Sequence, residues 1–570
     1  LHATRAAALS GLVLLAPSSN AQELAWAQAI GALGDDVVQS MTTDADGNVL
    51  QAGYFEGTVD LDPGAGQVMR TSNGLNDVFV QKLTADGALA WAFSVGGNDA
   101  DYATGISVDA DGNVYVTGAF NGTVDFDPGA ATTSLTSAGE YDMFLTKFSA
   151  DGALLRAQGI GGPGYDEPKC VAVGPLGNVY LLSYFSATID ADPGVDVLPM
   201  TSEGALDILL QKFDDHGELL WAQTTGSEGA DLGLSMALDA NENIWITGSF
   251  EGTLDMDPSA SAFELTSAGA WDIFVTKRGP DGTFLWAGRM GGPENFDTGY
   301  DIAVDADGNA IVVGSFFGTG DFDPGAGVHE LTAHSLGSDD VFVQKLSSAG
   351  VFQWAVGIGG TDADLAYGVA LADDGRIDVT GLFSGTADFD PDASATFEMT
   401  TSSIDNFFDS YVLELRDDGQ FLSAWQFGGA NSIATQSIAR GADEALFVAG
   451  HFENAADFDP GATATTLTSA GFRDAFTLRI DGIGAGVQAH VRPDAPVLFP
   501  NPASDAVMIA VDPALIGASY DVCDEQGRTV ANGRLTGLRT RLAVTGLAAG
   551  RYHVRVLSEG TPAATFVVAR

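Results

Sequence analysis

The amino-acid sequence predicts an all-β chain, namely a seven-bladed β-propeller closed by an N-terminal strand and followed by a small Ig-like β-sandwich. Three observations lead to this fold class. A unit of 65 to 69 residues recurs seven times. Each unit reads as four strands, and the strand that the last unit lacks is found near the N-terminus.

A phenylalanine marks the start of the same segment in every unit. It stands five residues before the first aspartate of an Asp-x-Asp-Pro motif, as in GTVDFDPGA. Repeats at such a period are typical of propellers and solenoids. The marker residues are Phe55, Phe120, Phe185, Phe250, Phe316, Phe383 and Phe452.

Residues 103–160 show the predicted structure of one unit. Four strand-like runs, ATGISVD, NVYVTGAF, DMFLTKFS and ALLRAQGI, are called strands A to D here. Asp-Gly turns separate A from B and C from D, which indicates hairpins. The Asp-x-Asp motif lies in an enlarged loop between B and C, and no segment predicts a helix.

The two ends of the repeat array predict a closed ring. The last unit has strands A to C but no strand D. Residues 23–31, ELAWAQAIG, match strand D of other units, such as ELLWAQTTG. We therefore expect the N-terminal strand to complete the seventh unit, which an open solenoid would not require.

The motif D-G-N-x-Y-x-T-G-x-F, here Asp111 to Phe120, resembles the bacterial seven-bladed β-propeller (SBBP-type) repeat family. This resemblance covers about residues 22–483 and implies a fold. It does not imply one activity, because propellers serve as enzymes, binding modules and scaffolds.

The composition excludes some partners. The chain has 77 acidic and 24 basic residues, for a formal net charge of −53. Such a charge repels phosphate backbones, so we expect no nucleic-acid partner. Cys170 and Cys523 fall in strand-like runs of different predicted domains, and we expect both to be buried and unpaired.

The N-terminus predicts export. Arg5 precedes a short apolar run, residues 6–16, and a small-residue cleavage site ends at Ala21. The run is too short to span a bilayer, and we expect no transmembrane segment in the mature chain. The predicted organisation is a secretory signal at 1–21, the propeller at 22–483, a linker at 484–496 and the sandwich at 497–570.

The C-terminal module closely resembles the sorting domain of cargo of the type IX secretion system. The matching residues are FPNP (499–502), D-x-x-G (524–527) and L-x-x-G-x-Y-x-V-x-V (547–556). The resemblance implies that the type IX machinery carries the protein through the outer membrane. It also implies a secreted protein, extracellular or on the outer cell surface. The usual terminal lysine is replaced by Arg570, which keeps a cation.

Acids gather at the predicted face that carries the B–C loops and the D–A connections, called the loop face below. A pair opens each B–C loop and a further aspartate opens each strand C. Three such carboxylates could bind Ca²⁺, the one possible cofactor; alternatively, each aspartate accepts backbone N–H bonds and builds a turn. The predicted sets are Asp60, Asp62 and Asp77; Asp125, Asp127 and Asp142; Asp190, Asp192 and Asp207; Asp255, Asp257 and Asp272; Asp321, Asp323 and Asp340; Asp388, Asp390 and Asp409; and Asp457, Asp459 and Asp474.

The residue before the strand C aspartate differs in every repeat. A variable position beside an invariant one predicts a recognition rim, where aromatic rings can stack on a sugar or a peptide. Alternatively, these side chains pack only on their own loops. The rim candidates are Tyr141, Trp271 and Phe408, with His329 and His334 in the longer fifth loop.

Three functions remain open from the sequence. The favoured one is a secreted or cell-surface binding or adhesion module for a surface glycan or protein. The alternatives are a secreted carbohydrate-active enzyme that uses carboxylates and a structural surface-layer component. No catalytic motif is found, so no catalytic residue is assigned, and the recurring lysine of strand C is expected to be an exposed charge.

Overall fold

The computed structural model describes residues 23–293, 296–335, 337–402, 407–459 and 464–481. It also describes segments at 497–499, 506–510, 518–524, 528–536, 539–544, 547–548, 550–556 and 564–568. The predicted signal (1–21) and linker (484–496) lie outside the described residues. The chain forms two compact units, residues 1–486 and 487–570.

The prediction of an all-β chain is confirmed, since every element in the described residues is a strand. Within these residues there is no helix long and apolar enough to cross a membrane. In the described part of the first unit, seven antiparallel sheets follow one another along the chain. Each contains four main strands, and the fifth and sixth sheets gain two more because their strand D also pairs with a short arm from the next B–C loop. In the order of strands A, B, C and D they are β2 (Val37–Thr43), β3 (Val49–Asp60), β4 (Met69–Leu83), β5 (Leu89–Val95); β6 (Tyr102–Val108), β7 (Val114–Phe120), β10 (Asp142–Phe148), β11 (Leu154–Ile160); β12 (Asp166–Val173), β13 (Val179–Phe185), β16 (Asp207–Phe213), β17 (Leu219–Thr225); β18 (Asp231–Leu238), β19 (Ile244–Phe250), β22 (Asp272–Arg278), β23 (Phe284–Met290); β24 (Thr298–Val304), β25 (Ala310–Phe317), β28 (Asp339–Leu346), β29 (Phe352–Gly360); β30 (Asp364–Leu371), β31 (Ile377–Phe383), β34 (Asp409–Leu415), β35 (Phe421–Gly429); and β36 (Ile433–Arg440), β37 (Leu446–Phe452), β40 (Asp474–Asp481), β1 (Glu23–Ile30).

The enlarged B–C loop of each of the seven repeats carries a short two-stranded arm. In the first repeat the arm is continuous with β3 and β4, where Asp60 pairs with Met69. The other arms are β8 (Thr123–Asp125) with β9 (Ser134–Thr136), β14 (Thr188–Asp190) with β15 (Pro199–Thr201), β20 (Thr253–Asp255) with β21 (Glu264–Thr266), β26 (Thr319–Asp321) with β27 (Glu330–Thr332), β32 (Thr386–Asp388) with β33 (Glu398–Thr400), and β38 (Ala455–Asp457) with β39 (Thr466–Thr468).

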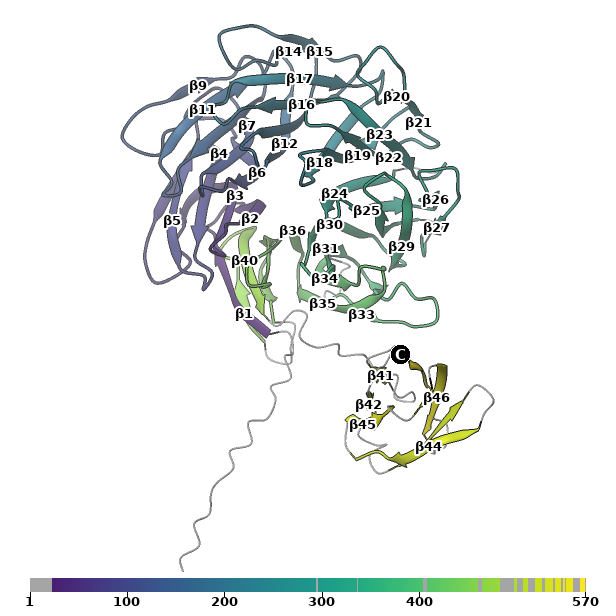
Figure 1. Cartoon of the computed structure of the whole chain (residues 1–570). Coiled ribbons are helices and arrows are strands. Elements are labelled where there is room, and N and C mark those ends of the chain that lie inside the picture. Colours follow the sequence, from purple (N-terminus) through teal and green to yellow (C-terminus); the bar gives the residue numbers. More distant parts are fainter. Residues whose placement is uncertain are drawn as a thin grey trace, which may run out of the picture. The chain divides into compact units, whose positions relative to one another are not determined.

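The sheets are arranged around a common centre, with strands A innermost (Figure 1). Each strand A contacts strand A of the next sheet, and β36 contacts β2. The predicted N-terminal strand pairing is confirmed, because β1 pairs antiparallel with β40. Apolar side chains fill the space between neighbouring sheets, and one cluster joins the first and last repeats through Val38, Phe55 and Phe447.

Stacking of the sheets explains the sequence pattern. Strand B is covered on both faces, so every side chain of β7 is buried. Strand D lies at the outer edge, and β11 exposes Leu155. Both cysteines are free, as predicted, but Cys170 and Cys523 are half-buried rather than buried.

The second unit contains two sheets around a core of its own. Tyr520, Val522, Val554 and Val556 are buried in it. One sheet has the order β41 (Val497–Phe499), β42 (Ala506–Ala510), β45 (Arg539–Ala543); the other has the order β44 (Thr529–Arg534), β43 (Ser519–Asp524), β46 (Gly550–Val556), β47 (Ala564–Val568).

Candidate functional site

The paired aspartates of each B–C loop bind backbone amides. In the second repeat, Oδ1 of Asp125 accepts hydrogen bonds from the N–H groups of Asp127, at 3.1 Å, and Thr133, at 2.8 Å. Oδ1 of Asp127 accepts one from the N–H of Gly129, at 2.7 Å. The first aspartate makes the same two kinds of bond in all seven repeats. These bonds close the loop at its base.

The residue between the two aspartates anchors the loop in the core. Phe126 is 1 % exposed and packs edge-on against Phe120, with ring centroids 5.4 Å apart. Alternation along an extended segment points this side chain inward and both carboxylates outward. The equivalent residues are also buried: Leu61, Ala191, Met256, Phe322, Phe389 and Phe458.

The aspartate that opens strand C is buried and caps its own loop. Oδ2 of Asp142 accepts the N–H of Ala138, at 2.9 Å. The D–A connection supplies another buried acid, Asp166, whose Oδ2 accepts the N–H of Gly162. Burial raises the pKa of Asp142, and it raises the pKa of Asp166 to about 7. The predicted gathering of B–C loops and D–A connections at one face is confirmed, because the Tyr141 carbonyl accepts the Asp166 N–H.

The structure therefore shows how the predicted acids build loops. Within the described residues, no group of three or more His, Cys, Asp or Glu side chains is placed to hold a metal ion. Calcium at these sets stays a prediction, and its test is given in the Discussion.

The expectation that the strand C lysine is exposed is wrong. Lys277 is 7 % exposed, lies 4.7 Å from the Trp245 ring centroid and forms an ion pair of 3.2 Å with Asp239 in the A–B turn. The ammonium group thus ties strand C to the turn beside it. The same pair occurs as Lys82–Asp44, Lys147–Asp109 and Lys345–Asp305. The signal for it was the joint recurrence of lysine and turn aspartate in these repeats.

The rim candidate Tyr141 belongs to a tyrosine cluster on the loop face. Its ring lies 5.9 Å from the rings of both Tyr102 and Tyr165. The hydroxyl groups of Tyr102 and Tyr165 donate to the Glu167 carboxylate, which is 8 % exposed. Burial and this hydrogen bond raise the pKa of Tyr165 to about 12. The rings are thereby held in position while they remain partly exposed.

Two further cluster members, Lys169 and Tyr184, complete the environment of Glu167. The Lys169 ammonium lies 3.2 Å from the carboxylate and 5.7 Å from the Tyr184 ring centroid. Sequence comparison of the repeats missed Glu167, although it was visible there: the other repeats have Val37, Tyr102, Leu232, Thr298, Leu365 and Ala434 at this position.

The other rim candidates are two aromatic residues, Trp271 and Phe408, and two histidines. Trp271 faces Phe296, which is 56 % exposed, with ring centroids 6.3 Å apart. Phe408 is half-buried, and its carbonyl accepts the N–H of Ile433. His329 packs on Phe352, and His334 Nδ1 lies 2.6 Å from Asp340. These histidines therefore attach their loop to β29 and β28 of the same repeat.

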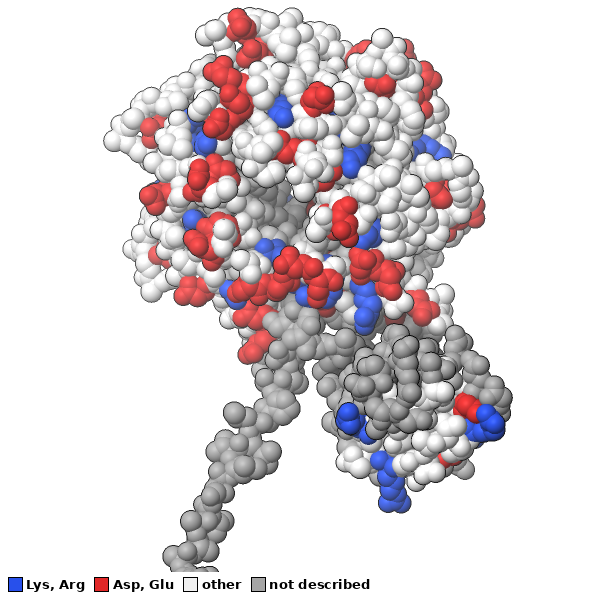
Figure 2. Space-filling view, in the orientation of Figure 1, with Lys and Arg blue, Asp and Glu red and all other residues white. Residues whose placement is uncertain are grey.

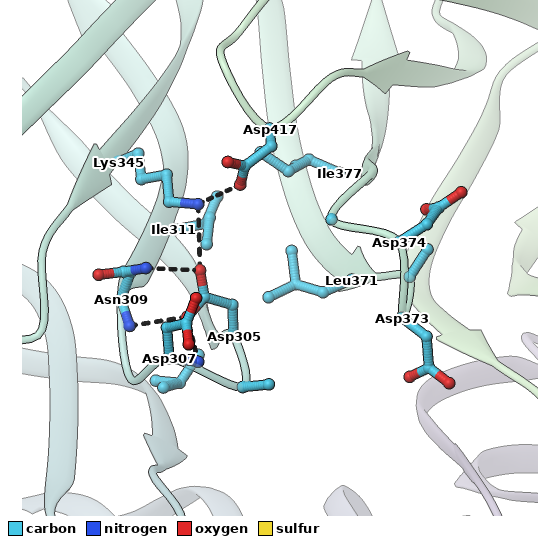
Figure 3. A pocket seen from close by; sticks show the side chains of 14 residues that line it. Asp305, Asp307, Asn309, Ile311, Lys345, Leu371, Asp373, Asp374, Ile377 and Asp417 are labelled. Atoms are coloured by element: carbon cyan, nitrogen blue, oxygen red, sulfur yellow. Dashed lines mark hydrogen bonds and ion pairs between the residues drawn. The ribbon is translucent and has the colours of Figure 1, made fainter.

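A cavity of about 450 Å³ lies at the opposite face, between the A–B turns of the fifth and sixth repeats (Figure 3). Asp305, Asp307, Lys345, Asp373 and Asp417 line it. The unit that contains it carries most of the charge, since residues 1–486 hold 70 acidic and 16 basic residues. Acidic side chains are scattered over the face visible in Figure 2, with fewer basic ones.

Comparison with known proteins identifies the C-terminal module. Residues 497–569 match the secretion system C-terminal sorting domain. The protein is therefore a secreted or cell-surface protein that uses the type IX route, and this route implies contact with the type IX machinery.

Two curated proteins are similar to the chain. An uncharacterized WD repeat-containing protein of Acanthamoeba polyphaga mimivirus is 22% identical over 511 residues, which is 75% of this chain and 36% of that protein. The regulatory protein FlaEY of Caulobacter vibrioides is 27% identical over 182 residues, 29% of this chain and 18% of that protein. The chain thus spans about a third or less of these relatives. Together with the repeated sheets, the WD-repeat similarity supports a β-propeller-like repeat protein.

Two solved structures are also similar. A protein of unknown function from Bacteroides caccae has a TM-score of 0.32 and 11% identity, covering 65% of this chain and 96% of that chain. PorZ, an essential surface component of the type IX secretion system of Porphyromonas gingivalis, has a TM-score of 0.17 and 11% identity, covering 95% and 100%.

Proposed function

We propose that this secreted protein is a seven-bladed, SBBP-type β-propeller that acts as a binding or adhesion module at the cell surface. The four-stranded sheets, the pairing of β1 with β40 and the apolar cluster between the first and last repeats support a closed ring. The sorting unit, as an Ig-like sandwich, directs export, and the ring carries the ligand.

The tyrosine cluster around Glu167 is the observation that supports a binding role. It breaks the repeat at the loop face, where a single asymmetric ligand can be distinguished. Partly exposed tyrosines combine an apolar ring with a polar hydroxyl, and their few rotatable bonds keep the entropy cost of binding low. A surface glycan is the ligand class that best fits rings beside a carboxylate and an ammonium group.

A glycan array combined with a polysaccharide degradation screen tests this proposal. We expect binding without product formation, weakened about tenfold by Tyr141→Ala, a loss of roughly 1.4 kcal/mol. His329→Ala is the control, because this histidine packs on β29 of the fifth repeat and is not part of the tyrosine cluster. Product formation would support the carboxylate enzyme, and ordered self-assembly without glycan binding would support the surface-layer component.

A further inference from the structure

The cavity between the fifth and sixth repeats has a mixed lining, in which a few apolar side chains lie among several acids. Ile311, Leu371 and Ile377 line it from β25, β30 and β31. The turn after β24 forms one wall and the turn after β30 forms the facing wall (Figure 3). A ligand with an apolar stem and a polar head would match this lining.

The single lysine of the cavity is already neutralised. Lys345 is 3 % exposed, and its ammonium group lies 3.0 Å from Asp305 and also contacts Asp417. Because two carboxylates flank this one cation, Lys345 does not make the cavity an anion site.

Two exposed carboxylates stand on the facing walls. Asp307 belongs to the fifth repeat and Asp373 to the sixth, and Figure 3 shows them on opposite sides of the cavity. Within the part of the chain that the structure describes, neither forms an ion pair. A cation in the mouth would therefore meet two carboxylates whose charge is not compensated by a lysine or arginine.

The corresponding space between the next pair of repeats holds a cationic side chain of the protein itself. Between the turns of the sixth and seventh repeats lies the guanidinium group of Arg376. It contacts Asp374 at 2.8 Å, Glu414 at 2.5 Å and Glu444 at 3.6 Å. The chain thus places its own guanidinium between the carboxylates of adjacent turns, one groove away from the cavity.

The turn residue Gly375 leaves the cavity open. At the equivalent turn position, the fourth repeat has Glu242 and the seventh has Glu444, and each side chain extends toward the preceding repeat. Gly375, like Gly47, Gly112, Gly177 and Gly308 at the same turn position, has no side chain, so no such side chain extends from the sixth repeat toward the fifth.

From these contacts we infer that the cavity is a binding site for an organic cation, a guanidinium or ammonium group on an apolar stem. The facing carboxylates suit a planar or extended cation better than a compact divalent ion, which needs several oxygens at one point. The source is either a free small molecule or a basic side chain of a polypeptide. The negative field of the ring would concentrate either one.

Calorimetric titration of the full chain tests the inference with four probes: agmatine, an acetylated and amidated Gly-Arg-Gly peptide, the same peptide with neutral citrulline, and calcium chloride. We expect both guanidinium probes to bind and the citrulline peptide not to bind. Tighter binding of agmatine identifies a small-molecule source, and tighter binding of the peptide identifies a polypeptide source.

The double variant Asp307→Asn/Asp373→Asn should weaken guanidinium binding about tenfold, as expected when two ion pairs are lost. The control is Asp46→Asn/Asp111→Asn, which removes the same charge from exposed aspartates in the A–B turns of the first and second repeats. An equal loss in the control, binding of the citrulline peptide, or displacement of agmatine by micromolar calcium would overturn the inference. Thermal midpoints of both variants show that the fold is retained.

Discussion

The carboxylate of Glu242 lies in the A–B turn of the preceding repeat, where Gly174 has no side chain. It accepts hydrogen bonds from the Leu176 N–H at 3.0 Å, Asn178 Nδ2 at 2.7 Å and the Tyr180 hydroxyl at 3.0 Å. In the first, second, fourth and fifth repeats an aspartate of the turn itself takes this role. Glu242 adopts a positive φ of 58°. In most other repeats the residue at this turn position is a glycine, which also has a positive φ. One repeat therefore supplies the anion that its neighbour lacks.

This relationship predicts a compensated pair of substitutions. Glu242→Ala should lower the free energy of unfolding by about 3 kcal/mol, because it leaves buried Lys212 and several donors without their carboxylate. Adding Gly174→Asp and replacing Glu242 by Gly restores the usual turn, and we expect this double variant to recover most of the loss. Urea unfolding of the wild-type protein, the Glu242→Ala variant and the double variant measures these free energies of unfolding. Additive destabilisation in the double variant would contradict the assignment.

The Asp-x-Asp loop predicts unequal roles for its two acids. Asp125→Ala removes an acceptor of two backbone N–H bonds and should cost about 2 kcal/mol, whereas Asp127→Ala removes one exposed bond and should cost about 0.5 kcal/mol. Urea unfolding of the two single variants compares them. Equal effects, or a larger effect of Asp127→Ala, would show that the loop is held in another way.

The acids at the D–A connections predict that stability falls as pH rises from about 4 to 8. Burial raises the pKa of Asp36, Asp101 and Asp297 to about 7 and that of Asp364 to about 8. Over this range the unfolded chain has lost these protons and the folded chain retains them, so each added pH unit favours unfolding until the folded pKa is passed. Thermal midpoints between pH 4 and 9 measure the slope. Asp364→Asn should reduce it, and an unchanged slope would contradict the assignment.

Below about pH 4 the opposite trend should begin. Ion pairing and hydrogen bonds lower the pKa of turn acids such as Asp44, Asp239 and Asp305 despite their partial burial. Their contribution to stability is present above the unfolded value of 3.8 and is lost as they gain protons. We therefore expect the highest thermal midpoint near pH 4.

Calcium is tested by melting the protein with calcium and then with a chelator at constant ionic strength. The backbone hydrogen bonds of the paired aspartates favour the loop-building alternative, so we expect the midpoint to be unchanged. A ligand that binds only the folded chain raises its stability, by about 2.7 kcal/mol at a hundredfold excess over Kd. A rise of several degrees in calcium would therefore support the metal sites.

The sequence was most informative where a pattern recurs. The spacing of Phe55, Phe120 and their equivalents located the sheets, and the likeness of residues 23–31 to strand D located β1. Contacts made by residues that differ from those at the same position in other repeats were not predicted. Glu242 looked like an ordinary turn residue because Gly174, which it compensates, is 68 positions away, and the burial of Lys277 depends on a turn packed beside it in space.

The candidate site was predicted only in part. The variable rim led to Tyr141, but Glu167, around which its cluster is organised, was not singled out, although no other repeat has an acid at its position. The cavity at the opposite face was not predicted at all. It lies beside Ala372, at the position where the first, second, fourth and fifth repeats have the turn aspartate.

The pairing of β1 with β40 also sets the order of events during synthesis. β1 leaves the ribosome first, and its partner follows roughly 450 residues later, which is about 20 to 90 s at common elongation rates. Throughout that interval the first strand has no neighbour to pair with and the growing sheet stack has two free ends. The pairing of β1 with β40 therefore cannot form before the seventh repeat is synthesised, a delay that leaves time for an export apparatus to engage the chain.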